Sequence, residues 1–118
     1  MRWTEMLKPE TVTQLRANWE EQKPLKGTLN EKDFEPVCKL FNPYGPGTWL
    51  ITECDEDGLC FGLADMGYPE MGYIDLQEIA DVRLLGGAGH IEQDLHFQPK
   101  QTIGQYAEEA RQLGYIRA

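Results

Sequence analysis

Residues 48–66 read TWLITECDEDGLCFGLADM, two apolar runs on either side of a short acidic loop. Each run has the length and the β-branched and aromatic content of a strand. Gly58 stands at the end of the loop, where a tight turn needs a positive φ. The spacing predicts an antiparallel hairpin that joins Thr48–Cys54 to Leu59–Met66.

The loop length fixes a register, because side chains alternate between the two faces of a sheet. We expect Cys54 to face Leu59 and Leu50 to face Leu63. Cys54 and Cys60 then lie on opposite faces, which favours small core residues over nucleophiles. Three cysteines cannot all pair within one chain, so a disulfide scaffold is disfavoured and a reducing cytoplasm is the expected location.

The same register places large side chains against small ones on one face of the hairpin. Trp49 faces Ala64 and Ile51 faces Gly62, so an indole can lie over a glycine. Both faces carry apolar residues, which predicts that helices cover part of each.

The other elements follow from periodicity, capping residues and breakers. The first helix, Pro9–Glu21, carries Val12, Leu15 and Trp19 on one face. The remaining predicted elements are a loop over 22–35, a strand over 36–41, a turn over 42–47, a turn over 67–70, a strand over 71–74, a short helix over 76–82, a strand over 91–97 and a helix over 103–113. The order predicts one α+β domain, residues 1–118, with an N-terminal helix, an antiparallel β-meander of about four strands, one further strand and a C-terminal helix.

The negative charge is concentrated in the middle of the chain. The 118 residues carry a net charge of −9, and residues 33–81 hold eleven acids against the single base Lys39. Such a segment repels nucleic acid and attracts basic partners. We therefore expect a protein partner and no direct binding to nucleic acid; solubility alone is the alternative explanation. No apolar run approaches the length that a membrane span requires, and the oligomeric state is not indicated.

Glu92, Asp94 and His96 form the most specific candidate site. Their period-two spacing places all three on one face of the strand over 91–97, where carboxylates and an imidazole can bind a metal or polarise a water. The alternative is that they form the solvated face of a strand that buries Leu95 and Phe97.

The turn over 67–70 is the preferred candidate for a binding site, because Asp65, Glu70 and Tyr73 bracket it and loops at sheet ends often form binding sites. The alternative is a structural role for Asp65 as a cap. Acidic residues at the hairpin tip could hold a cation, but acidic tips are common without one.

The expected binding residues are Glu53, Asp65, Glu70, Tyr73, Asp94 and His96. No catalytic residue, metal or cofactor is assigned, because no nucleophile–base, zinc or nucleotide-phosphate motif occurs.

Met66-Gly67-Tyr68 and Met71-Gly72-Tyr73 echo each other five residues apart. One such echo is too short to indicate a repeat architecture.

Five ordered motifs carry a family resemblance: residues 37–41 (VCKLF), 48–53 (TWLITE), 61–65 (FGLAD), 69–73 (PEMGY) and 92–97 (EQDLHF). Together they resemble the bacterial domain-of-unknown-function family 2958 over most of the chain. The resemblance implies a small protein encoded on plasmids and other mobile elements, near conjugation and antirestriction genes, with no catalytic residues to carry over. Gln93 stands where the family pattern leads us to expect an arginine, and the turn over 67–70 is shorter than usual.

The leading functional hypothesis is a non-enzymatic, cytoplasmic protein-binding module of a mobile genetic element. A sharper variant is an anti-defence protein, antirestriction or anti-CRISPR, whose acidic surface imitates DNA. A metal-dependent hydrolase using Glu92, Asp94 and His96, joined by Asp65 or Glu70, is the alternative from another class. An accessory subunit would instead show an exposed apolar patch near Trp3 and Trp19.

Overall fold

The computed structural model describes residues 1–118 and confirms the α+β fold. The helices are α1 (Trp3–Met6), α2 (Pro9–Gln22), α3 (Leu76–Ala80) and α4 (Ile103–Leu113), with a 3-10 turn at Leu85–Gly87. The strands are β1 (Cys38–Phe41), β2 (Thr48–Cys54), β3 (Leu59–Asp65), β4 (Pro69–Asp75) and β5 (Glu92–Gln93). None of the helices combines the length and the apolar character that crossing a bilayer requires.

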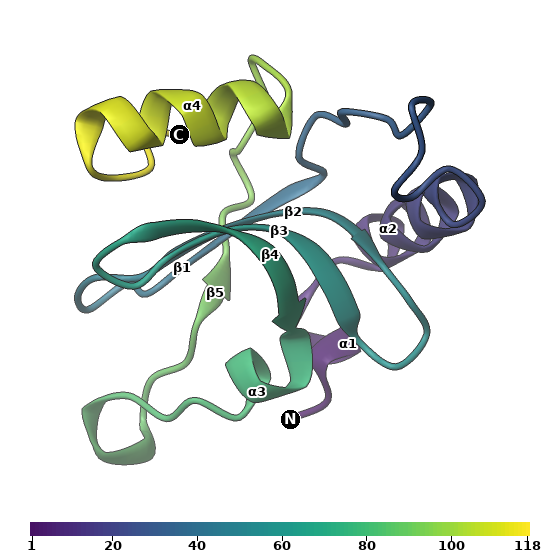
Figure 1. Ribbon diagram of the computed structural model, residues 1–118. Helices are drawn as coiled ribbons and strands as arrows, with labels where there is room; N and C mark the ends of the chain where they lie inside the picture. The colour runs from purple at the N-terminus through teal and green to yellow at the C-terminus, as the bar shows by residue number, and fades with distance from the viewer.

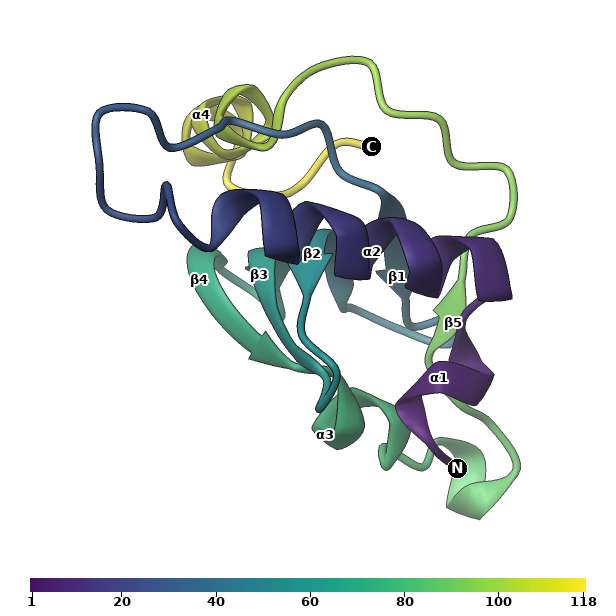
Figure 2. The same cartoon turned by 90° about the vertical axis from the view of Figure 1, so that its right-hand side faces the viewer.

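The five strands form one antiparallel sheet in the order β4-β3-β2-β1-β5. The meander β1 to β4 is therefore confirmed, and β5 joins it beside β1. β4 and β5 occupy the two opposite edges of the sheet (Figure 2).

Helices lie on both sides of the sheet, as the apolar residues on both hairpin faces predict. α4 lies on one side, α1 and α3 lie on the other, and α2 crosses the strands at one end (Figures 1 and 2). Alternate residues of β2 enter two separate hydrophobic clusters. Trp49 and Ile51 join the larger cluster with residues of α1, α2 and α3, whereas Leu50 joins the smaller one with α4.

The buried side of α2 is more polar than its sequence predicts. Val12 and Trp19 are only half-buried, whereas Thr11, Asn18 and Gln22 are buried beside Leu15. Each of these polar side chains has a hydrogen-bond partner outside the helix: Gln93 for Thr11, the Thr52 carbonyl for Asn18, and the Lys32 backbone for Gln22. Burial of polar groups is tolerated when they are paired in this way.

A β-bulge at Thr52 changes the register of the central hairpin. The predicted pairs hold from Trp49 to Ile51, but beyond the bulge Glu53 faces Phe61 and Cys54 faces Cys60. The predicted pair of Cys54 with Leu59 is therefore wrong. An extra residue in one strand leaves a backbone group outside the ladder, and here the Thr52 carbonyl accepts a hydrogen bond from Asn18 Nδ2 at 2.9 Å.

The strand edges also differ from prediction at the next turn. Pro69 and Glu70 belong to β4, where they pair with Asp65 and Ala64, so the turn consists of residues 66–68 alone. By contrast, α4 begins and ends as predicted: Thr102 and Gln105 form a capping box, and Gly114 has a φ of 86° at the C-cap.

Candidate functional site

Two of the predicted binding residues have structural roles. Asp65 accepts hydrogen bonds from the backbone N–H groups of Gly67 and Ile116, which closes the turn after β3 and fixes the C-terminal segment. Asp94 accepts one from the backbone N–H of His96 and lies 3.7 Å from Lys39 Nζ. Carboxylates engaged in this way hold the fold together and are not free for a ligand.

The structure does not assemble the predicted site at Glu92, Asp94 and His96. β5 ends at Gln93, and the Asp94 side chain turns the chain immediately afterwards, so only residues 92–93 of the predicted strand over 91–97 form a strand. Leu95, predicted to be buried, is exposed. No group of three or more His, Cys, Asp or Glu side chains is arranged to hold a metal ion. β1 and β2 lie between β5 and β3, which carries Asp65.

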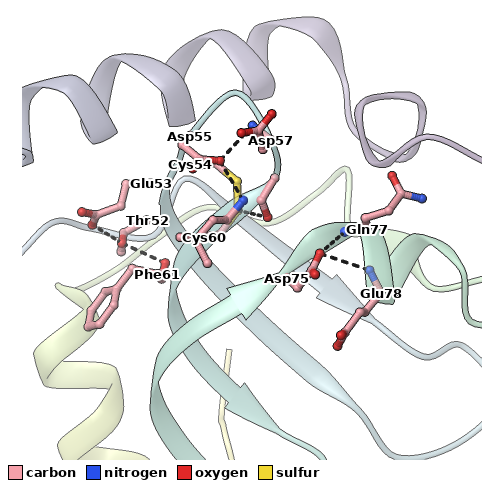
Figure 3. Close-up of a disulfide and its surroundings, with 12 residues drawn as sticks. Thr52, Glu53, Cys54, Asp55, Asp57, Cys60, Phe61, Asp75, Gln77 and Glu78 are labelled. Atoms are coloured by element: carbon pink, nitrogen blue, oxygen red, sulfur yellow. Dashed lines mark hydrogen bonds between the residues drawn. A yellow bond between two sulfur atoms is a disulfide. The ribbon is translucent and has the colours of Figure 1, made fainter.

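Several carboxylates of the acidic middle segment have structural roles. Four of its eleven acids, Asp33, Asp55, Asp65 and Asp75, each accept at least two hydrogen bonds from nearby loops or helix starts. Figure 3 shows two of these, with Asp55 closing the hairpin loop and Asp75 capping α3. These carboxylates are explained by turn and cap formation.

Cys54 and Cys60 face each other across β2 and β3 and are joined by a disulfide (Figure 3). Their Cα atoms are 4.1 Å apart, and both side chains are fully buried. The expectation that they lie on opposite faces is wrong because the bulge shifts the register by one residue. The expectation against disulfide bonding is wrong for this pair, so the cysteine content does not support a reducing location. Cys38 is the free thiol, and burial raises its pKa to about 12, which keeps it protonated and unreactive.

Glu53 is buried in a small polar cluster beneath the loop that follows α2. Only 3% of Glu53 is exposed, and it lines a cavity of about 180 Å³ together with Trp19, Lys26 and Tyr73. Lys26 Nζ lies 3.3 Å from the centroid of the Phe61 ring, a cation–π contact. The bulge places Glu53 here, since it moves the side chain onto the face that carries Phe61.

Desolvation raises the pKa of the Glu53 carboxyl, and the charge of Glu31 acts in the same direction, while Thr52 and Lys26 oppose both. Thr52 Oγ1 lies 2.7 Å from Glu53 Oε1 and 3.1 Å from the Phe61 carbonyl oxygen. One hydroxyl hydrogen cannot serve both acceptors. The shorter of the two hydrogen bonds is donated by Thr52 Oγ1 to Glu53 Oε1, and it lowers the pKa of the carboxyl against the effect of burial.

Glu53→Gln is expected to raise the free energy of unfolding at pH 7 by about 1 kcal/mol, because a neutral amide is buried at less cost than the carboxylate whose pKa is raised by burial. A pKa that is higher in the folded than in the unfolded state makes stability fall as pH rises between the two values. The gain should therefore vanish below the unfolded pKa of about 4.3, where the native carboxyl is neutral in both states. Urea unfolding at neutral and acidic pH measures this. Exposed Glu20→Gln on α2 is the control, and a Glu53→Gln protein that is less stable at pH 7 would contradict the prediction.

The remaining two predicted residues, Glu70 and Tyr73, line a groove. The groove has a volume of about 580 Å³ and lies between the β4 side of the sheet and α3. Small residues leave this groove open. Ala64 lies between Trp49 and Glu70 in one cross-strand row, and Gly62 pairs with Gly72 in the next row on the same face. A Cβ atom added at Gly72 would meet nothing within 4 Å, so this part of the sheet is open to solvent.

Nine of the thirteen residues that line the groove are hydrophobic, which makes it an apolar surface. Met66, Tyr68 and Tyr73 are the most exposed of them, at 74%, 72% and 59%. The charged residues of the lining are Glu70, Asp75 and Glu78, with no Lys, Arg or His. The groove is therefore apolar with a purely acidic rim.

The sequence did not single out Met66, Tyr68 or Met71 as part of a site. The signal was the Met-Gly-Tyr echo, whose four large side chains all line this groove. The apolar patch considered for an accessory subunit lies here and not at the first helix, because Trp3 is buried and Trp19 is half-buried.

Comparison with protein families gives one match, over residues 6–117, to the family described as protein of unknown function (DUF2958). The chain belongs to this family. The match confirms the resemblance carried by the five ordered motifs. The chain matches no curated protein and no solved structure.

Proposed function

We propose that this member of the family is a non-enzymatic binding module that holds another protein in the groove beside β4. The observation that carries the proposal is the exposure of Met66, Tyr68 and Tyr73 around a mainly hydrophobic groove. Contiguous exposed apolar surface with a polar rim is typical of protein–protein contact sites, and tyrosine and methionine are enriched at their centres.

The charge of the rim indicates the chemistry of the partner. Glu70 and Glu78 have no cation among their groove neighbours, and the chain carries a net charge of −9. A basic partner surface would be attracted during encounter and would neutralise these carboxylates when bound. An acidic partner would place like charges together.

The proposed setting is the bacterial cytoplasm, in a protein carried by a mobile genetic element. The family resemblance supports this setting, and the partner would then be a protein of the element or of its host.

Affinity capture from a host lysate, followed by reconstitution with the purified partner, tests the proposal. Tyr68→Ala and Met66→Ala should each weaken the reconstituted complex by about tenfold, the effect expected of a central contact residue. Both side chains are largely exposed, so the fold should survive. The matched controls are Leu29→Ala and Leu95→Ala, which remove exposed leucines outside the groove and should leave the affinity unchanged.

The same complex distinguishes the DNA-mimic hypothesis. Glu56→Lys and Asp57→Lys reverse two exposed charges at the hairpin tip, outside the groove. A mimic would lose its partner on these reversals, would be displaced by duplex DNA and would weaken steeply with salt. If the tip variants abolish binding while the groove variants do not, the groove is not the binding site.

A further inference from the structure

The edge strand β4 forms one wall of the groove and has free backbone groups. It has a single neighbour, β3, with which it pairs without a bulge from Pro69 to Asp75. Just beyond the strand end, Leu76 N–H donates to the Gly58 carbonyl. Because hydrogen-bonded and non-hydrogen-bonded pairs alternate in an antiparallel ladder, the N–H and C=O groups of Met71, Tyr73 and Asp75 point away from β3. The Asp75 carbonyl accepts the first helical bond of α3, so the unpaired backbone groups are the N–H and C=O of Met71 and Tyr73 and the N–H of Asp75.

The two edges of the sheet differ in how they are protected. β5 is only two residues long, and the turn at Asp94 follows it directly. β4 has seven residues, no bulge, no lysine and a proline only at its first position. Proteins usually protect exposed edges by shortening, bulging or placing lysine on them, since an open edge pairs readily with another chain. β4 lacks these devices, and it is the edge beside the apolar groove.

We infer that the partner contributes an extended basic segment that pairs with β4 as a sixth strand. This inference rests on the proposed function and specifies how the groove is occupied. Addition of a strand to an open sheet edge is a common mode of peptide recognition, in which backbone bonds supply affinity and alternate side chains supply specificity.

The side chains of β4 define the pattern that such a segment needs. Glu70, Gly72 and Ile74 lie on the face that carries Trp49 and Ala64, while Met71 and Tyr73 alternate to the opposite face and border the groove at the β4 edge. A lysine or arginine beside Glu70 would form an opposite-charge cross-strand pair, and an apolar residue beside Met71 or Tyr73 would cover exposed surface. The open space above Gly72 admits a large side chain. The expected motif therefore alternates basic and apolar residues.

A second copy of this chain is disfavoured as the added strand. Pairing of two β4 edges would bring together two copies of the acidic rim formed by Glu70, Asp75 and Glu78. Like charges placed opposite each other destabilise a strand pair, so charge complementarity selects a basic partner.

Titration of the ¹⁵N-labelled protein with a synthetic peptide of alternating arginine and valine tests strand addition. Binding should shift the amide signals of Met71, Tyr73 and Asp75 and slow their hydrogen exchange. The same peptide with N-methyl groups on alternate residues keeps its charge and side chains but loses the backbone donors. The methyl groups can fall on either of two alternate sets of residues, which gives two registers. Methylation of the set whose N–H groups would bond to β4 should weaken binding by at least about tenfold. Glu70→Lys should also weaken binding, whereas the exposed control Glu20→Lys should not.

Strand addition is overturned if both methylated registers bind as tightly as the parent, if the shifts fall outside β4, or if the peptide does not bind. It is also overturned if the protein dimerises through β4 and the peptide cannot compete. In each case the proposed function stands or falls separately, on whether the captured partner loses affinity for Tyr68→Ala and Met66→Ala.

Discussion

Gly62→Ala is expected to lower the free energy of unfolding by about 3 kcal/mol, the upper end of the usual range for overpacking. A Cβ atom at Gly62 would clash with the Leu50 carbonyl oxygen and would lie 3.1 Å from the Ile51 Cα. Both are backbone atoms of the central strand β2, so the clash cannot be relieved by rotation of a side chain. The pair Ile51–Gly62 borders the bulge at Thr52, and a shift here would also disturb Glu53 and its cavity.

Gly72→Ala is the matched control, because Gly72 pairs directly with Gly62 across β3 and β4. A Cβ at Gly72 meets nothing within 4 Å. This substitution should change stability by less than about 1 kcal/mol. Urea unfolding measures the free energy of unfolding of both variants. Equal stability of the two variants would show that β2 and β3 do not approach each other as described.

Leu50→Ala should destabilise the protein by about 3 kcal/mol, within the range for buried leucines. Leu50 is fully buried and is one of only two sheet residues in the cluster that holds α4, the other being Leu63. Truncation leaves a cavity beside Ile103 and Tyr106, which belong to the same cluster. Thermal and urea unfolding measure the loss. Leu29→Ala removes the same atoms from a fully exposed position and should not change the free energy of unfolding. An equally unchanged stability for Leu50→Ala would contradict the described core.

The meander and the last helix could be predicted because their signals are local. Alternating apolar residues, glycine turns and the Thr102–Gln105 capping box each specify their element without help from the rest of the chain. The bulge could not be predicted, because it depends on Asn18 of α2 reaching the Thr52 carbonyl. One inserted residue was enough to misplace Glu53 and Cys54, since a shift of one exchanges the faces of a strand.

The candidate site was predicted only in part, for a related reason. Glu70 and Tyr73 were identified from their position near a turn, but the groove depends on small residues of β3 and β4 lying beside Trp49 of β2. Conversely, the alternation over 91–97 is typical of a strand, yet the Asp94 side chain bonds to the backbone of His96 and forms a turn instead. Side chains that compete for backbone donors are hard to detect from periodicity alone.

The hydrogen bonds that close the loops of the meander have a consequence for the order of folding. Asn42, Asp55 and Asp65 each bond to a backbone N–H two residues ahead, and Asp75 does the same at the start of α3. Every reversal of direction from β1 to α3 thus carries its own stabilising contact at short sequence separation. Low sequence separation favours rapid chain closure. We expect the hairpins to form first as the polypeptide collapses, with the two long helices docking onto an already assembled sheet.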